Sequence, residues 1–226
     1  TVTPDEGYEL DELTVTDASG NAVAVTKVSD TRYTFTMPRS RVTVSATFVA
    51  EEPLVFSDVP ANAYYADAVY WAVENGVTVG TSATTFGPAR ALTRAESVTF
   101  LWRAYGCPEP ETTVNPFTDV SETAYYYKAV LWAMENGVTY GTSATTFTPG
   151  RPVTRAEALT FQWRAAGSPE VTGDGFSDVE ADAYYADAVT WAVANGITRG
   201  TGGNTFTPAG DVSRAQAVTF LYRQLG

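Results

Sequence analysis

Residues 93–105 read TRAESVTFLWRAY, and closely related stretches follow at 154–166 (TRAEALTFQWRAA) and 213–225 (SRAQAVTFLYRQL). The three stretches start 61 and 59 residues apart, and such a fixed spacing indicates an internal repeat. A Phe-Ser/Thr-Asp-Val motif keeps the same register, beginning at Phe56, Phe117 and Phe176. A tryptophan and an Asn-Gly pair also recur at these spacings. The chain therefore contains three copies of one unit.

The first half of each unit is typical of a short amphipathic helix. In the first unit the apolar residues fall at i, i+3, i+4 and i+7, which places them on one helical face: Tyr65, Ala68, Val69 and Ala72. The Asn75-Gly76 pair ends this helix, because glycine readily adopts the left-handed conformation that follows a helix C-terminus. A loop rich in glycine and β-branched residues comes next.

The second helix of each unit is predicted to begin at a capping box. In such a box the Thr93 hydroxyl accepts a hydrogen bond from the Glu96 N–H, and the Glu96 carboxylate accepts one from the Thr93 N–H. Thr154 with Glu157 repeats the pattern, and Ser213 with Gln216 repeats it without the charge. The unit is therefore helix, loop, helix.

About sixty residues with two short helices supply too little core to fold alone. We therefore expect a mainly α fold in which three repeats, at residues 54–112, 113–172 and 173–226, pack around a central helical bundle. The assembly is expected to be monomeric and pseudo-three-fold, with grooves between repeats. The linkers at residues 107–116 and 168–175 are rich in proline and acidic residues.

The first fifty residues have a different pattern. The segments LTVTD, AVAVT, YTFTM and VTVSATF alternate apolar and hydroxyl residues, which is typical of half-exposed strands. Residues 17–21 form a turn cluster, and Met37-Pro38 ends the third strand. Residues 1–50 are thus expected to form a small antiparallel β module, followed by a linker at residues 50–53. The motifs PDEGYEL and YTFTMP resemble the internalin-type β-repeats of bacterial surface proteins, and relative to that family the module is expected to be truncated at its start.

Composition excludes several classes of function. A net charge of −12 disfavours nucleic-acid binding, and the absence of histidine removes Ser-His-Asp catalysis and imidazole metal sites. The single cysteine, Cys107, allows neither an internal disulfide nor a thiolate metal cluster, and its role is left open. No apolar run is long enough to insert in a membrane. We expect no cofactor, no metal and no catalysis.

An arginine occupies the first helical position of every second helix: Arg94, Arg155 and Arg214. The positive end of the helix dipole lies there and favours an anion, so a cation at this position requires another explanation. One interpretation is a bidentate grip on a ligand carboxylate. The other is an ion pair with an aspartate of a neighbouring repeat. The residues alone favour neither.

Three further sets of residues recur with the repeats. The first-helix tryptophans Trp71, Trp132 and Trp191 each share a helix flank with the tyrosine seven residues earlier: Tyr64, Tyr125 and Tyr184. This aromatic flank either packs between repeats or offers a platform for sugar rings. The acids of the first motif are expected to be turn or N-cap residues: Asp58, Asp119 and Asp178. The loop glycines permit an unusual backbone angle or the close approach of a ligand to the main chain: Gly80, Gly141 and Gly200. No function is assigned to the arginines that end the second helices, Arg103, Arg164 and Arg223.

At FSDV, AVxWAxxNGV, TFxP and TRAE, residues 54–226 closely resemble the S-layer homology family. The resemblance implies a trimer-like fold within one chain, extracellular and at the bacterial cell wall or S-layer. It implies non-covalent anchoring through a secondary cell-wall polymer, commonly one with pyruvylated N-acetylmannosamine. By position, the repeated arginines, first-motif acids, first-helix tryptophans and loop glycines would form the ligand site.

The third repeat departs from the other two. It has SRAQ in place of TRAE, and Arg199 replaces Val79 and Tyr140. The grooves are therefore expected to be unequal, and which of them bind glycan is left open. The alternative function is a protein-interaction or lattice module without direct glycan binding, and a surface glycosidase is the third hypothesis. The acids recur at cap positions in all three repeats, which does not favour a glycosidase.

Overall fold

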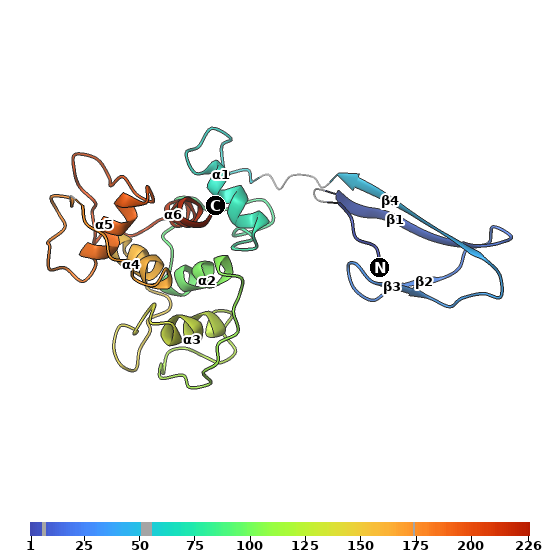
Figure 1. Ribbon diagram of the computed structural model, residues 1–226, viewed down its shortest axis with the longest axis horizontal. Helices are drawn as coiled ribbons and strands as arrows, with labels where there is room; N and C mark the ends of the chain where they lie inside the picture. Colours follow the sequence, from blue (N-terminus) through green and yellow to red (C-terminus); the bar gives the residue numbers. More distant parts are fainter. Residues whose placement is uncertain (6–7, 51–55, 174) are drawn as a thin grey trace. The chain divides into compact units, whose positions relative to one another are not determined.

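The computed structural model describes residues 1–5, 8–50, 56–173 and 175–226 (Figure 1). The chain divides into two compact units, residues 1–54 and residues 55–226. Residues 51–53 of the expected linker lie outside the described residues.

The first unit consists of two antiparallel strand pairs. Strand β1 (Tyr8–Asp17) pairs with β4 (Val42–Ala50), and β2 (Val25–Lys27) pairs with β3 (Tyr33–Phe35). The Asp17 carboxylate accepts hydrogen bonds from the backbone N–H groups that follow it in the predicted turn. The prediction of an antiparallel β module is confirmed, and most of its side chains are exposed.

The second unit contains, within its described residues, two helices for each repeat. They are α1 (Ala66–Glu74), α2 (Arg94–Ala104), α3 (Tyr127–Glu135), α4 (Arg155–Ala165), α5 (Ala186–Ala194) and α6 (Arg214–Leu225). All three predicted capping boxes form, with Thr93, Thr154 and Ser213 as N-caps. Gly76 follows the first helix with a φ of +66°, as predicted.

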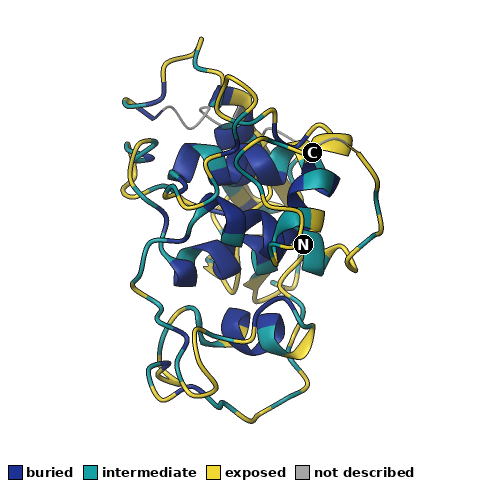
Figure 2. Cartoon of the chain, turned by 90° about the vertical axis from the view of Figure 1, so that its left-hand side faces the viewer, coloured by how far each residue is buried: buried dark blue, intermediate teal, exposed yellow. Residues whose placement is uncertain are grey.

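The helices of different repeats pack on one another. Helix α1 packs on α6, α3 packs on α2, and α5 packs on α4, so each first helix lies on the second helix of a different repeat. Helices α2, α4 and α6 also contact each other and are grouped at the middle of this unit (Figure 1). Their inward faces are buried, as the dark blue segments of Figure 2 show. The buried apolar residues of the three repeats belong to one common core cluster.

Backbone hydrogen bonds join the three repeats directly. Leu92 N–H donates to Val212 O at 2.9 Å, Val153 N–H donates to Leu92 O at 2.9 Å, and Val212 N–H donates to Val153 O at 3.0 Å. The three side chains are buried. Each repeat thus gives one hydrogen bond and receives one at a shared, dry centre.

The packing predicts that the repeats fold cooperatively. Residues 54–112 expressed alone should show no sharp thermal transition by far-ultraviolet circular dichroism, because α1 lacks α6 and α2 lacks α3, α4 and α6. Residues 54–226 should show a single sharp transition under the same conditions. A cooperative transition in the 54–112 fragment would contradict the interlocked packing.

Candidate functional site

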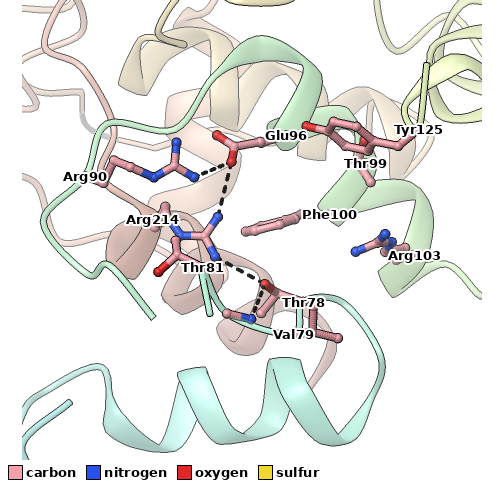
Figure 3. Close-up of a pocket in the computed structure, with 11 residues that line it drawn as sticks. Thr78, Val79, Thr81, Arg90, Glu96, Thr99, Phe100, Arg103, Tyr125 and Arg214 are labelled. Atoms are coloured by element: carbon pink, nitrogen blue, oxygen red, sulfur yellow. Dashed lines mark hydrogen bonds and ion pairs between the residues drawn. The ribbon is translucent and has the colours of Figure 1, made fainter. Parts of the chain in front are cut away.

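A groove of about 520 Å³ lies where the three repeats meet beside α2 (Figure 3). Its lining comes from the loop after α1, from one face of α2, from the second repeat and from the third repeat. These residues are Thr78, Val79, Gly80, Thr81, Arg90, Glu96, Thr99, Phe100, Arg103, Tyr125 and Arg214. We call this place the first junction.

Arg214 crosses from the third repeat into the first junction. Its Nε donates to Phe86 O at 2.9 Å, its Nη2 donates to Thr78 Oγ1 at 3.2 Å, and its Nη1 lies 3.4 Å from a carboxylate oxygen of Glu96 (Figure 3). The guanidinium carbon lies 4.9 Å from the centre of the Phe86 ring and 5.1 Å from that of Phe100. Only 2% of Arg214 is exposed. The side chain therefore joins the third repeat to the first at the floor of the groove.

Glu96 carries two tasks in this junction. One carboxylate oxygen accepts the capping bond from Thr93 N–H at 3.0 Å, and the other pairs with Arg90 and Arg214. Burial alone would raise the pKa of Glu96, but the hydrogen bonds from Arg90 and Thr93 and the two arginine charges lower it overall. The carboxylate is therefore ionised at neutral pH and offsets part of the arginine charge.

A second junction, beside α4, has the same construction. Arg94 donates from Nε to Phe147 O at 2.9 Å and from Nη1 to Glu157 at 2.9 Å. Arg151 also pairs with Glu157, at 2.5 Å. This groove is lined by residues of all three repeats: Arg94, Thr139, Tyr140, Gly141, Glu157, Thr160, Phe161, Arg164 and Tyr184.

At the third junction, beside α6, Arg155 also binds the carbonyl oxygen of a phenylalanine in the neighbouring repeat. Its Nε donates to Phe206 O at 2.8 Å, and its guanidinium carbon lies 4.7 Å from the centre of the Phe206 ring. Arg94, Arg155 and Arg214 are 2%, 5% and 2% exposed. All three arginines therefore brace neighbouring repeats, and two of them also line a groove. The ion-pair interpretation holds for Arg94 and Arg214, although their partners are glutamates of a neighbouring repeat and not aspartates. The grip on a ligand carboxylate stays a prediction.

Two of the three first-helix tryptophans contact an aromatic ring of another repeat. The Trp71 ring centre lies 5.8 Å from that of Tyr222 in the third repeat, and that of Trp132 lies 5.8 Å from that of Tyr105 in the first. Trp132 and Trp191 are 7% and 5% exposed, and Trp71 is half-buried. Little of the Trp132 and Trp191 side chains is therefore left to meet a sugar.

The tyrosines of the same flank are exposed, unlike the tryptophans. Tyr125 and Tyr184 line the first and second grooves, and they are 63% and 61% exposed. The corresponding Tyr64 is 67% exposed. Each stands edge-on against the next tyrosine in the chain, with ring centres 5.0 Å apart. The seven-residue spacing from each tryptophan identified these tyrosines in the sequence, but it did not show which member of each pair stays exposed.

The repeated aspartates hold the loop that the arginines bind. Asp58 accepts hydrogen bonds from the N–H groups of Phe86 and Gly87, both at 2.8 Å, and the carbonyl of that same Phe86 binds Arg214. Asp119 and Asp178 make the equivalent bonds. The turn assignment is correct, but the N-cap alternative is wrong, because Tyr65 is the N-cap of α1 and makes no side-chain cap bond.

The repeated loop glycines are fixed by close packing. Gly80 has a φ of +86°, and a Cβ added to it would lie 2.6 Å from the Phe56 ring and 2.6 Å from Thr85 O. Its N–H donates to Thr78 Oγ1 at 3.2 Å. Gly141 and Gly200 have the same geometry. A side chain at these positions would displace the loop that forms one wall of the junction.

Sequence reasoning missed the arginines that end the second helices. Arg103 donates to Val77 O at 3.2 Å and lines the first groove, and Arg164 donates to Val138 O at 3.3 Å and lines the second. Arg103 stands seven residues after Glu96, which places both on one face of α2. That helical spacing could have identified these arginines.

The described part of the chain contains no group of acids and cysteine that could hold a metal ion. None of its helices has the length and apolar character needed to cross a membrane.

Comparison with known proteins confirms both resemblances. The S-layer homology domain family matches residues 55–96, 116–159 and 175–218, and the divergent InlB B-repeat domain family matches residues 1–52. The Surface-layer 125 kDa protein of Lysinibacillus sphaericus is 36% identical over 146 residues, which is 62% of this chain and 12% of that protein. The S-layer protein sap of Bacillus anthracis is 28% identical over 82% of this chain and 23% of its own length. An endoglucanase of Bacillus sp. (strain KSM-635) is 28% identical over 74% of this chain and 18% of its own length. The chain thus spans less than a quarter of each of these relatives.

The bracing contacts predict a large effect of Arg94→Ala on stability. The change leaves Glu157 and Phe147 O without their buried partner and should lower the free energy of unfolding by about 3–5 kcal/mol. Arg90→Ala removes a side chain that is 44% exposed and should cost at most about 1 kcal/mol. All five tryptophans lie in the second unit, so their fluorescence during urea unfolding reports on this unit alone. Equal costs for the two variants would contradict the bracing role.

Proposed function

This chain belongs to the S-layer homology domain family, and from that premise we propose that it anchors a bacterial surface protein non-covalently to the cell wall. The ligand is an anionic secondary cell-wall polysaccharide that carries pyruvylated N-acetylmannosamine. The location is extracellular, at the bacterial cell wall or S-layer.

One observation carries the proposal: an acidic chain concentrates positive charge in the grooves between its repeats. The net charge of the chain is −12, yet the first groove holds three arginines and one glutamate. The second groove is lined by Arg94, Arg164 and Glu157, and Arg151 pairs with that glutamate. A positive field confined to a groove attracts an anionic polymer while the rest of the surface repels it. A ketal carboxylate supplies the matching charge.

The polar and aromatic rims of these grooves support a carbohydrate ligand. In the first groove Tyr125 offers an exposed ring, and the exposed Thr81 offers a hydroxyl group. Sugars combine apolar ring faces with hydroxyl groups, so a groove of about 520 Å³ with both kinds of surface suits one or two sugar residues. We assign the stacking role to the tyrosines and a bracing role to Trp71, Trp132 and Trp191.

We further propose that the repeats, bounded as residues 54–112, 113–172 and 173–226, are related by a pseudo-three-fold axis. The cyclic order of contacts supports this arrangement. Arg94 reaches the second repeat, Arg155 reaches the third and Arg214 returns to the first. The aspartates and loop glycines then serve the ligand indirectly, by fixing one wall of each groove.

The chain itself is proposed to be non-catalytic. The carboxylates at the junctions and loops, Glu96, Glu157, Asp58, Asp119 and Asp178, are all occupied by backbone N–H groups or arginines. The endoglucanase among the relatives is consistent with an anchor joined to a separate catalytic region, because this chain spans 18% of that protein.

Co-sedimentation with purified, deproteinised cell walls tests the proposal. The chain should pellet with walls that retain the pyruvylated polymer and remain in solution with walls from which that polymer has been extracted. Equal pelleting with both would refute the assigned ligand. Failure to pellet with either, together with binding to isolated surface-layer protein, would favour the alternative lattice module.

Because the chain divides into two compact units, we expect that deleting residues 1–50 leaves cell-wall binding intact. Wall binding by residues 51–226 should equal that of the whole chain in the same co-sedimentation, because the three arginine junctions lie within residues 56–226. A large loss of binding in the deletion variant would assign part of the glycan site to the β module.

A further inference from the structure

The third junction contains a buried cation that lacks the partner found at the other two. Arg94 pairs with Glu157, and Arg214 pairs with Glu96. Within residues 56–173 and 175–226 no ion pair forms at Arg155, so its Nη1, the nitrogen that meets glutamate at the other two junctions, has no carboxylate partner. Its Nη2, which meets a threonine hydroxyl at those junctions, is buried without a hydrogen-bond partner. Arg155 is only 5% exposed, so this cation is largely desolvated without a paired acid.

The missing partner has a local cause in the sequence. Gln216 stands where Glu96 and Glu157 stand in the other repeats, and Gly210 stands where Arg90 and Arg151 stand. Gln216 Oε1 accepts the capping bond from Ser213 N–H at 3.2 Å. Its other terminal atom, Nε2, is therefore a donor at the place where the glutamates present an oxygen to arginine. By its position in the repeat, Gln216 therefore offers Arg155 a donor where Glu96 and Glu157 offer an acceptor.

The surroundings of Arg155 increase this positive charge. Arg223 donates to Ile197 O at 3.0 Å, as Arg103 and Arg164 do at the other junctions. Arg199 is exposed at the loop position where Val79 and Tyr140 line the first and second grooves. Three arginines thus meet no glutamate at the third junction, whereas each of the other junctions has three arginines and one glutamate.

We infer that the third junction is the principal carboxylate site of this chain. The ligand carboxylate takes the place beside Arg155 that Glu96 and Glu157 fill at the first and second junctions. It accepts hydrogen bonds from the Arg155 guanidinium and from Gln216 Nε2. At the other two junctions the chain's own glutamate competes with the ligand. This inference rests on the proposed glycan-binding function and specifies which of its sites is strongest.

The test restores the missing carboxylate in the whole chain. Gln216→Glu keeps the capping box, since glutamate fills that place in the other two repeats. The probe is the methyl glycoside of N-acetylmannosamine carrying a pyruvate ketal, titrated calorimetrically. Gln216→Glu should weaken the tightest binding step about ten- to a hundredfold, because it removes a charge-assisted hydrogen-bonding site. Ala18→Glu adds the same charge in the other compact unit and should leave the affinity unchanged.

A reciprocal variant opens the second junction. Glu157→Gln should create an additional binding step, because Arg94 then lacks its acid as Arg155 does. Unchanged affinity in Gln216→Glu with a higher melting temperature would overturn the inference, since the new carboxylate would then only brace Arg155. If the wild-type chain binds the probe and Gln216→Glu does not weaken it, the inference fails while the proposed function stands. If the wild-type chain binds neither the probe nor cell walls, the proposed function itself fails.

Discussion

The fold depends on which groups accept hydrogen bonds from the first backbone N–H groups of each second helix. The first backbone N–H groups of a helix have no partner inside it. Here they donate to the next repeat: Arg94 N–H binds Arg151 O at 2.9 Å, and Ala95 N–H binds Pro149 O at 3.1 Å. Because carbonyl groups already meet the positive end of the helix, the side chain at its first position need not be acidic. An arginine can therefore stand there, extend to Phe147 O and line a groove at the same time.

Local features of this fold could be predicted from sequence, and contacts between repeats could not. The Thr93–Glu96 capping box and the turn at Gly76 depend on residues close together in the chain, and both are present. The partner of Arg94 lies 53 residues away, so the sequence alone could not decide between ligand and brace. The helical spacing placed Tyr64 and Trp71 on the same flank. It could not show that Trp71 would meet Tyr222 of another repeat while Tyr64 stayed exposed.

The three repeats share the same capping boxes and backbone frame, but the charged residues at their junctions differ. Glu96 and Glu157 each serve two arginines, and in the third repeat both the glutamate and the outer arginine are replaced. Gln216 retains the capping bond, so the substitution removes charge without removing the helix start. In Glu96 one carboxylate oxygen accepts the capping bond and the other pairs with the arginines. Replacing this glutamate by glutamine therefore removes the ion pairs and keeps the cap. This separation allows one repeat to change the charge at its junction while the frame stays intact.

The packing of α1 on α6 has a consequence for the order in which the chain matures. During synthesis α1 emerges early, and the helix that covers it emerges last among the described elements. The first repeat therefore lacks the helix that covers α1 until the third repeat has been synthesised. The last helix of the unit therefore completes the packing of the first, and the three repeats close as one body.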